Sequence, residues 1–145
     1  MTRLLTIVCS VLSLTALTSA ALADTDNEVE ARKVALGLAG AFSNDGFKIR
    51  DGYWTGSVKP GEPALVAVNL YAGNQYWFSV GSADKESKLA VRLHDEAGRP
   101  LPTDNYEEDE KAAAGFSPEI SGQYFVSVAP SAGDASTYCL VYSYK

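Results

Sequence analysis

Two patterns of apolar residues divide the chain after residue 23. Between residues 24 and 45 the apolar side chains recur at helical spacing, and from Phe47 onwards they alternate with polar ones. A helix places positions i, i+3, i+4 and i+7 on one face, whereas a strand places every second residue on one face. The sequence therefore predicts one N-terminal helix followed by a region of strands.

The predicted helix spans residues 24–45. Its apolar stripe is formed by Ala31, Val34, Ala35, Leu38 and Phe42. Thr25 and Glu28 have the spacing of a capping box, and Asn44-Asp45-Gly46 is a typical end signal. Because so short an amphipathic helix is only marginally stable alone, we expect its stripe to dock on the strands.

Residues 46–145 are predicted to form about seven short strands separated by turns rich in Gly, Pro, Asn and Asp. The strand segments are 51–58, 63–71, 75–80, 88–96, a short strand ending near Phe116, 123–128 and 137–145. The charged stretch 105–111 is expected to be a connection. Short alternating strands with turn signals between them are typical of an all-β, antiparallel, jelly-roll-like β-sandwich.

The first 23 residues have the layout of a signal peptide. Arg3 supplies the positive charge, Leu4 to Leu17 is an uncharged apolar run, and Ala21-Leu22-Ala23 is a cleavage motif before Asp24. The run is shorter than the roughly 20 apolar residues that a membrane-spanning helix needs. We therefore expect an exported protein, periplasmic or secreted, that begins at Asp24.

The net charge limits the class of partner, and the cysteine content indicates how the fold is stabilised. The chain carries a net charge of −6, and removal of Arg3 makes it one unit more negative. Such a surface disfavours binding to nucleic acid or anionic lipid by general electrostatics. Cys139 is the one cysteine left after cleavage, so the exported chain has no internal disulfide and depends on its apolar core.

The strand region resembles the bacterial pre-peptidase C-terminal (PPC) domain. The similarity covers about residues 52 to 144 and is carried by an "AGxxYxF" motif, an Asp and a Gly at the next turn, a later aromatic, an "SGxYxxxV" strand and a Tyr-rich last strand. The matching residues are Ala72, Gly73, Tyr76, Phe78, Asp95, Gly98, Phe116, Ser121, Gly122, Tyr124, Val128 and Tyr138. The resemblance implies a β-sandwich that acts as a non-catalytic accessory module of exported enzymes.

Two features depart from that family: no enzyme domain is attached, and an N-terminal helix is present. Periplasmic lysozyme inhibitors of the invertebrate-type class are similar in layout, with an "AG" turn before one strand and an "SGxY" strand. That similarity is the weaker of the two.

Candidate catalytic residues are few. His94 is the only histidine and is expected on the outward face of a strand, Ser121 lies in a turn without a "GxSxG" motif, and Cys139 is expected to pack as a small strand residue. A catalytic triad needs a nucleophile, a base and an orienting group within hydrogen-bond reach. The sequence therefore predicts no enzyme.

A run of carboxylates is the one candidate metal site. Asp104, Glu107, Glu108 and Asp109, with Glu110 next to them, offer the oxygen ligands that calcium prefers, although EF-hand spacing is absent. The alternative is a solvated charge run that protects a sheet edge from pairing. No cofactor is expected beyond this weak possibility of calcium.

Outward-facing aromatic residues are the candidate ligand-binding positions. Trp54, Trp77, Phe125 and Tyr106 are expected outside the core. They could stack on sugar rings or fill a partner's pocket. The interpretation we favour is that the helix covers Trp77 and Phe125, because leaving two apolar surfaces in water is unfavourable.

These observations favour an exported, non-enzymatic β-sandwich that recognises a protein or polysaccharide in the cell envelope. Two alternatives stay open: a periplasmic inhibitor of a lysozyme-type hydrolase, towards which the negative charge would steer a cationic enzyme, and a structural domain whose helix mediates oligomerisation.

Overall fold

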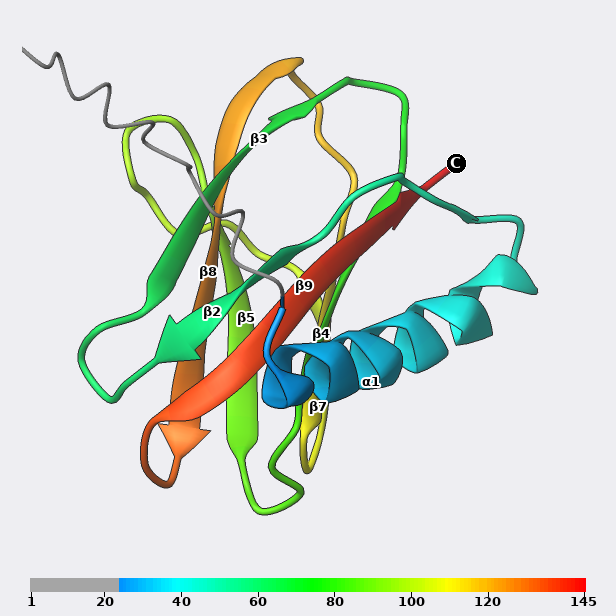
Figure 1. Cartoon of the computed structure of the whole chain (residues 1–145). Coiled ribbons are helices and arrows are strands. Elements are labelled where there is room, and N and C mark those ends of the chain that lie inside the picture. The colour runs from blue at the N-terminus through cyan, green and yellow to red at the C-terminus, as the bar shows by residue number, and fades with distance from the viewer. Residues whose placement is uncertain (1–23) are drawn as a thin grey trace, which may run out of the picture.

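The computed structural model describes residues 24–145 as one helix and nine strands (Figure 1). The predicted signal peptide, residues 1–23, lies outside the described residues. The elements are α1 (Asp26–Ser43), β1 (Lys48–Ile49), β2 (Trp54–Val58), β3 (Ala64–Leu70), β4 (Tyr76–Ser82), β5 (Lys88–His94), β6 (Asp104–Glu108), β7 (Lys111–Phe116), β8 (Gly122–Ala132) and β9 (Ser136–Tyr144).

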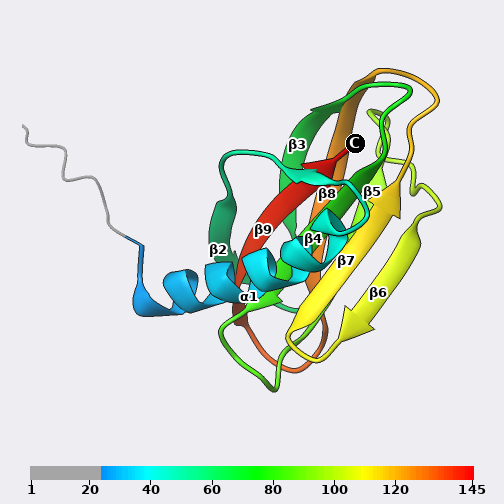
Figure 2. The same ribbon diagram turned by 90° about the vertical axis from the view of Figure 1, so that its right-hand side faces the viewer.

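The strands form two antiparallel sheets. The larger sheet has the order β1-β9-β4-β7-β6, and β2 also pairs with β9; the smaller sheet has the order β3-β8-β5. The two sheets pack face to face, so the predicted antiparallel β-sandwich is confirmed, with nine strands in place of about seven (Figures 1 and 2).

The core lies between the sheets and is formed by alternate residues of each strand. Val66, Val68 and Leu70 of β3 are buried while their neighbours are exposed. In β9, Tyr138, Leu140 and Tyr142 belong to this core, whereas Cys139 and Val141 face the other way. The period-two alternation of these strands therefore separates the core side from the outer side.

The interpretation of residues 105–111 as a connection is wrong. Asp104 to Glu108 form β6, an edge strand that makes a hairpin with β7, and Glu108 pairs with Lys111. Asp109, in the tight turn, has a φ of 48°, the left-handed region that Gly or Asn usually occupies in such hairpins. The hairpin was missed because its turn contains no Gly or Asn and its strand carries charges instead of alternating apolar residues.

Helix α1 lies across the outer face of the six-stranded sheet (Figure 2). Its buried residues Ala31, Ala35 and Ala39 form one cluster with Cys139 and Val141 of β9. The predicted capping box is present, since Thr25 and Glu28 bond each other's backbone N–H groups at 2.8 and 3.2 Å. The helix is thus confirmed. Of its predicted stripe, Ala31 and Ala35 are buried, Val34, Leu38 and Phe42 are half-buried, and Ala39 is buried although it was not predicted to be part of the stripe.

Within the described range 24–145, no helix combines the length and apolar character needed to cross a membrane.

Candidate functional site

Trp77 is covered by the helix, as the sequence analysis expected. Its ring stacks on Phe42 of α1, with ring centroids 4.4 Å apart and planes 9° from parallel. On the sheet it lies over Gly115, its cross-strand neighbour in β7, which has no side chain to obstruct the ring. Trp77 is therefore part of the helix–sheet contact and is not an exposed platform.

The expectation that α1 also covers Phe125 is wrong. Phe125 belongs to β8 in the three-stranded sheet, whereas α1 packs on β4 and β9 of the other sheet. Both sheets carry an aromatic residue on the outer face, so the pattern alone did not decide between them. The helix packs on the six-stranded sheet because Gly81, Cys139 and Val141 have small side chains or none. The alanine residues of α1 can therefore approach this part of the sheet closely.

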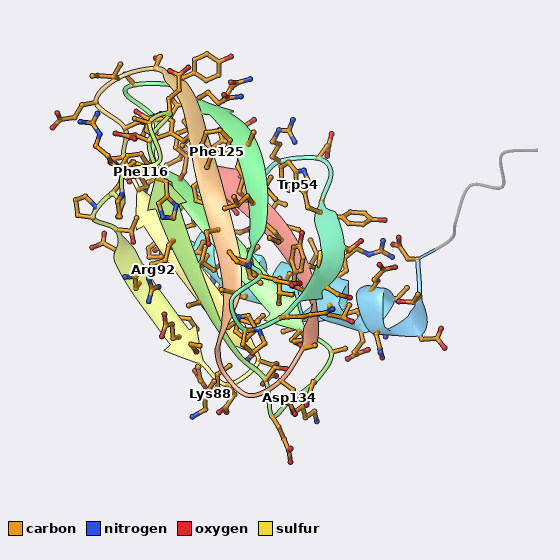
Figure 3. All side chains as sticks on the ribbon, turned by 90° about the vertical axis from the view of Figure 1, so that its left-hand side faces the viewer. Trp54, Lys88, Arg92, Phe116, Phe125 and Asp134 are labelled. Carbon is orange, nitrogen blue, oxygen red and sulfur yellow. The ribbon has the colours of Figure 1, made fainter. Side chains whose placement is uncertain are left out.

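The outer face of the three-stranded sheet was expected to be covered by the helix at Phe125, but α1 does not cover it. We call it the open face and define it by Leu65 and Ala67 of β3, Phe125 of β8, and Arg92 and His94 of β5. The register places Phe125 between Ala67 and His94, in the middle of the sheet. Figure 3 views this side, with Phe125 and Arg92 labelled and α1 behind the sheets.

The open face is mainly apolar along its β3 side. Leu65 is 64% exposed, and Ala67 beside it is exposed too. A shallow hollow of about 460 Å³ is lined by Leu65, Phe125 and His94 together with the turn residues Glu96, Ala97 and Gly98. The open face thus combines an exposed apolar side chain with an adjoining hollow.

Polar groups border the β5 side of the open face. The Arg92 guanidinium forms an ion pair with Glu107 of β6 at 3.0 Å. His94 is half-buried, and its Nδ1 atom is buried without a hydrogen-bond partner among the described residues. His94 thus retains an unused polar atom at the edge of the hollow.

Trp54 does not face outwards as expected. It lies in β2 and packs partly buried against the core, with its ring 6.0 Å from that of Tyr142. Arg50 covers both rings, with its guanidinium carbon 5.9 Å from the Trp54 centroid and 5.2 Å from the Tyr142 centroid. The aromatic group closes the side of the sandwich where β2 and β3 meet, and Figure 3 shows Trp54 at that side.

Tyr106 lies away from the open face, on β6 of the six-stranded sheet. It is 36% exposed, and its hydroxyl donates a hydrogen bond to the Glu108 carboxylate. That hydrogen bond raises the pKa of Tyr106 above its ordinary value. The four aromatic residues singled out from the sequence therefore lie in four different environments and do not form one row.

The structure does not bring the predicted calcium ligands together. Asp104, Glu107 and Glu108 lie along β6, where successive side chains point to opposite faces, and Asp109 is in the turn. Glu107 is already paired with Arg92. Among residues 24–145 no group of three His, Cys, Asp or Glu side chains is placed to hold a metal ion.

The three candidate catalytic residues are also apart. Cys139 is fully buried beneath α1, and this burial raises the pKa of its thiol to about 12. His94 is on the open face of the other sheet. The Ser121 hydroxyl accepts a hydrogen bond from the Ala72 N–H at 2.8 Å, so it holds two turns together.

The motif residues shared with the PPC pattern have structural contacts. The Tyr124 hydroxyl donates to the Ile120 carbonyl at 2.6 Å, which resembles the tyrosine corner of other β-sandwiches. The Tyr76 hydroxyl accepts from the Tyr71 N–H at 2.9 Å and from the Asn74 amide at 3.2 Å. These tyrosines shape the turns at one end of the sandwich.

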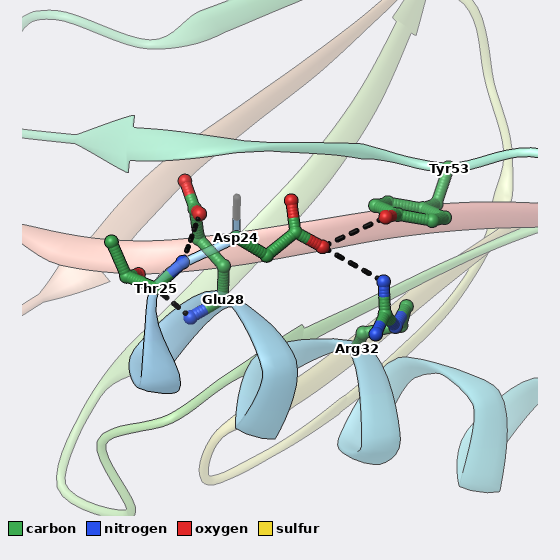
Figure 4. A network of polar contacts seen from close by, with 5 residues as sticks. All are labelled: Asp24, Thr25, Glu28, Arg32 and Tyr53. Atoms are coloured by element: carbon green, nitrogen blue, oxygen red, sulfur yellow. Dashed lines mark hydrogen bonds and ion pairs between the residues drawn. The ribbon is translucent and has the colours of Figure 1, made fainter. Parts of the chain in front are cut away.

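A polar network that sequence reasoning missed joins the start of the described chain to Tyr53, the residue just before β2 (Figure 4). The Asp24 carboxylate accepts from Arg32 at 2.8 Å and from the Tyr53 hydroxyl at 2.7 Å. The Asp24 contact raises the pKa of Tyr53. No local pattern could have revealed it, because Tyr53 lies 29 residues from Asp24.

No protein-family model matches the chain, and no curated protein matches its sequence.

Proposed function

We propose that this chain is an exported, non-enzymatic binding module that contacts a protein partner of the cell envelope through the open face. The observation that carries the proposal is the asymmetry of the sandwich. Helix α1 covers the outer face of one sheet, whereas the other sheet presents Leu65 at 64% exposure beside a hollow lined by Phe125.

A protein partner fits this surface better than a polysaccharide. Sugar rings stack on flat, exposed aromatic side chains, but Trp77 lies under α1 and Trp54 packs against the core. The exposed apolar residues of the open face, Leu65 and Ala67, are instead aliphatic. Arg92 is exposed on the other side of this face, and Phe125 and His94 are half-buried. An apolar centre with a polar border is the usual composition of protein interfaces.

The resemblance to the PPC domain supports the same class of function, because that family consists of accessory modules of exported enzymes. The signal-peptide pattern of residues 1–23 supports export. The separation of His94, Ser121 and Cys139 offers no catalytic arrangement of those three residues.

The experiment compares two variants that each remove one exposed aliphatic side chain. Leu65→Ser changes the open face, and Ile120→Ser changes a residue that is 75% exposed at the end of the sandwich. Each protein is used to capture envelope proteins, and each captured protein is then purified and titrated against the wild type. We expect one partner whose affinity falls about tenfold or more with Leu65→Ser, as is common for a central interface residue, and stays unchanged with Ile120→Ser.

The proposal is wrong if no purified envelope protein binds the wild type. It is also wrong if Leu65→Ser and Ile120→Ser both bind every partner with the affinity of the wild type. A glycan array tests the competing class of ligand. Binding of the wild type to a glycan, lost with Leu65→Ser, would replace the protein partner by a polysaccharide.

A further inference from the structure

A narrow cleft opens between β2 and β3, on the side of the sandwich where Trp54 lies. The two strands are joined at one end, where the backbones of Lys59 and Glu62 bond each other at 3.0 and 3.4 Å. Further along they diverge, because β2 pairs with β9 in the larger sheet and β3 pairs with β8 in the smaller one. The cleft has a volume of about 290 Å³, and the residues that line it include Arg50, Trp54, Ala67, Asn69, Tyr71 and Tyr142.

Arg50 supplies the charge of this cleft, and the fold fixes its position. Its backbone N–H donates to the Tyr142 carbonyl at 2.9 Å, which continues the pairing of β1 with β9. Its guanidinium carbon lies 5.9 Å from the Trp54 ring centroid and 5.2 Å from the Tyr142 ring centroid. The negative face of an aromatic ring attracts a cation. The guanidinium is therefore held at the cleft before any ligand binds, which lowers the entropy cost of binding.

Among residues 24–145, Arg50 is the one arginine without an ion pair. The other three arginines form ion pairs with carboxylates: Arg32 with Asp24, Arg92 with Glu107, and Arg99 with Asp95. The Arg50 guanidinium donates instead to the Asp51 backbone carbonyl at 3.2 Å, which occupies only part of its N–H groups. On a chain with a net charge of −6, this cation can accept an anionic group from another molecule.

The other polar side chains of the cleft are uncharged and can donate hydrogen bonds. No aspartate or glutamate of the described part of the chain lines the cleft, whereas the Asn69 amide and the Tyr71 and Tyr142 hydroxyls do. Burial raises the pKa of Tyr142, although the positive charge of Arg50 opposes this shift. The Tyr142 hydroxyl therefore keeps its proton at neutral pH, and the cleft combines one positive charge with several donors.

We propose that this cleft binds one carboxylate group, supplied by an aspartate or glutamate side chain of the protein partner. The planar guanidinium fork of Arg50 matches a carboxylate through two parallel hydrogen bonds. The cleft is no larger than the smallest ligand pockets, which hold about 300–1,000 Å³, so it suits a single side chain. Ala67 belongs both to this cleft and to the open face, so a partner on the open face can reach Arg50. The inference rests on the proposed function for its partner and adds the chemistry that this partner presents.

An acidic side chain fits the cleft better than an acidic sugar does. A sugar ring stacks on a flat and exposed aromatic face. Trp54 is half-buried and Tyr142 is buried, and Arg50 covers both rings. Among the aromatic residues of the cleft, Tyr71 alone is exposed.

The test titrates the full chain, purified in the form in which it accumulates, with two probes at constant ionic strength. The probes are the α-amides of N-acetyl-glutamate and N-acetyl-glutamine, which have nearly the same shape and differ in charge. The NMR signals of the Trp54 indole N–H and the Arg50 Nε–H report on the cleft. The Trp77 indole N–H, beside Phe42 of α1, is the internal control.

We expect the glutamate probe to shift the two cleft signals in a saturable way with a millimolar dissociation constant. The glutamine probe should bind about tenfold or more weakly, because it lacks the charge that Arg50 pairs with. The Trp77 signal should not move with either probe. Equal binding of the two probes, or the absence of a saturable shift, overturns the proposal.

Variants of two arginines separate the cleft from the overall charge. Arg50→Gln should weaken binding of the glutamate probe about tenfold or more, and Arg50→Lys should weaken it less, because lysine keeps the charge but loses the fork. Arg99→Gln removes the same charge from an exposed turn and is the matched control, which should bind like the wild type. The proposal is wrong if Arg50→Gln binds like the wild type or if Arg99→Gln weakens binding equally. If Arg50→Gln does not fold, the comparison of the two probes in the wild type still decides.

Glucuronate, with glucose as its neutral control, tests the other source of a carboxylate. If glucuronate binds more tightly than the glutamate probe, and glucose does not bind, an acidic sugar replaces the acidic side chain and the proposal is overturned. Because these titrations use small probes alone, their outcome is independent of the Leu65→Ser experiment. A cleft that binds no carboxylate leaves the open-face partner in place, and loss of that partner leaves the cleft result in place.

Discussion

Gly81 of β4 lies directly beneath Ala35 of α1. A Cβ atom built on Gly81 would come within 2.6 Å of the Ala35 backbone nitrogen and 2.7 Å of the Ala31 carbonyl oxygen. Both contacts are with helix backbone, which cannot move aside without moving the whole helix. This glycine therefore sets the distance between α1 and the six-stranded sheet.

Gly81→Ala should lower the free energy of unfolding by about 1–3 kcal/mol, the usual cost of inserting a methyl group into a closely packed contact. Gly37→Ala is the matched control, because a Cβ at Gly37 meets no atom within 4 Å. That control should be neutral or stabilising by up to about 1 kcal/mol, since alanine favours the helix. Urea unfolding of both variants measures the difference; equal stability of Gly81→Ala and wild type would contradict this packing.

The stacked pair of Phe42 and Trp77 should contribute measurably to the attachment of α1. We expect Trp77→Ala to cost about 3 kcal/mol, and a double-mutant cycle with Phe42→Ala to give a coupling energy of about 0.5–1.5 kcal/mol. Tyr71→Ala is the control, because Tyr71 is 62% exposed. It should cost less than about 0.5 kcal/mol. A coupling energy of zero would mean that the two rings stabilise the protein independently.

Cys139 should be unreactive towards thiol reagents while the protein is folded. The reactive form is the thiolate, and burial raises the pKa of this thiol to about 12 from a usual value of 9.0. Labelling with iodoacetamide at pH 8 should follow the rate of unfolding and accelerate in denaturant. Rapid labelling of the native protein would show that α1 opens away from β9.

The same pKa shift has a consequence for stability in alkali. The unfolded thiol loses its proton near pH 9, whereas the folded thiol keeps it up to about pH 12. The folded state therefore binds more protons in this window, and the stability contributed by the neutral thiol should decline as the pH rises from 9 to 12. Urea midpoints for wild type and Cys139→Ala should converge over that range; parallel curves would contradict it.

Glycine substitutions at the two positions of the β6–β7 turn should have opposite effects on stability. Asp109 has a φ of 48°, and no other non-glycine residue in the described range has a positive φ. Asp109→Gly should raise the free energy of unfolding by up to about 1 kcal/mol, because glycine adopts this conformation without steric cost. Glu110→Gly, at the next position, should lower it by a similar amount through the greater freedom of the unfolded chain. Thermal unfolding of the two variants should give shifts of opposite sign.

The local features of this fold could be predicted from sequence, and the longer-range ones could not. The capping box, the helical stripe and the alternation in β3 and β9 depend on residues within a few positions of one another. Which sheet receives the helix depends instead on how Gly81, Cys139 and Val141 come together from two strands. That information is spread over about 60 positions of sequence and has no periodic pattern.

Two strands were misjudged for separate reasons. Strand β8 runs to Ala132 through Pro130, a residue that usually ends a strand, because Pro130 lies at the bulge opposite Leu89 where a ladder hydrogen bond is dispensable. Strand β6 carries a charged sequence because it lies at an edge, where charges protect against pairing. The acidic run therefore lies at a sheet edge, the position that the second of the two interpretations from sequence assumed.

The position of β9 determines when the fold can form. This strand pairs with β1, β2 and β4 and also supports α1 through Cys139 and Val141. Until the ribosome has released residues 136–144, β1 and β2 have no strand to pair with, and α1 has β4 but not β9 to pack on. The complete six-stranded sheet can therefore form only after residues 136–144 have been synthesised. Residues near the start of the described chain reach their final contacts only when almost all of that chain has been made.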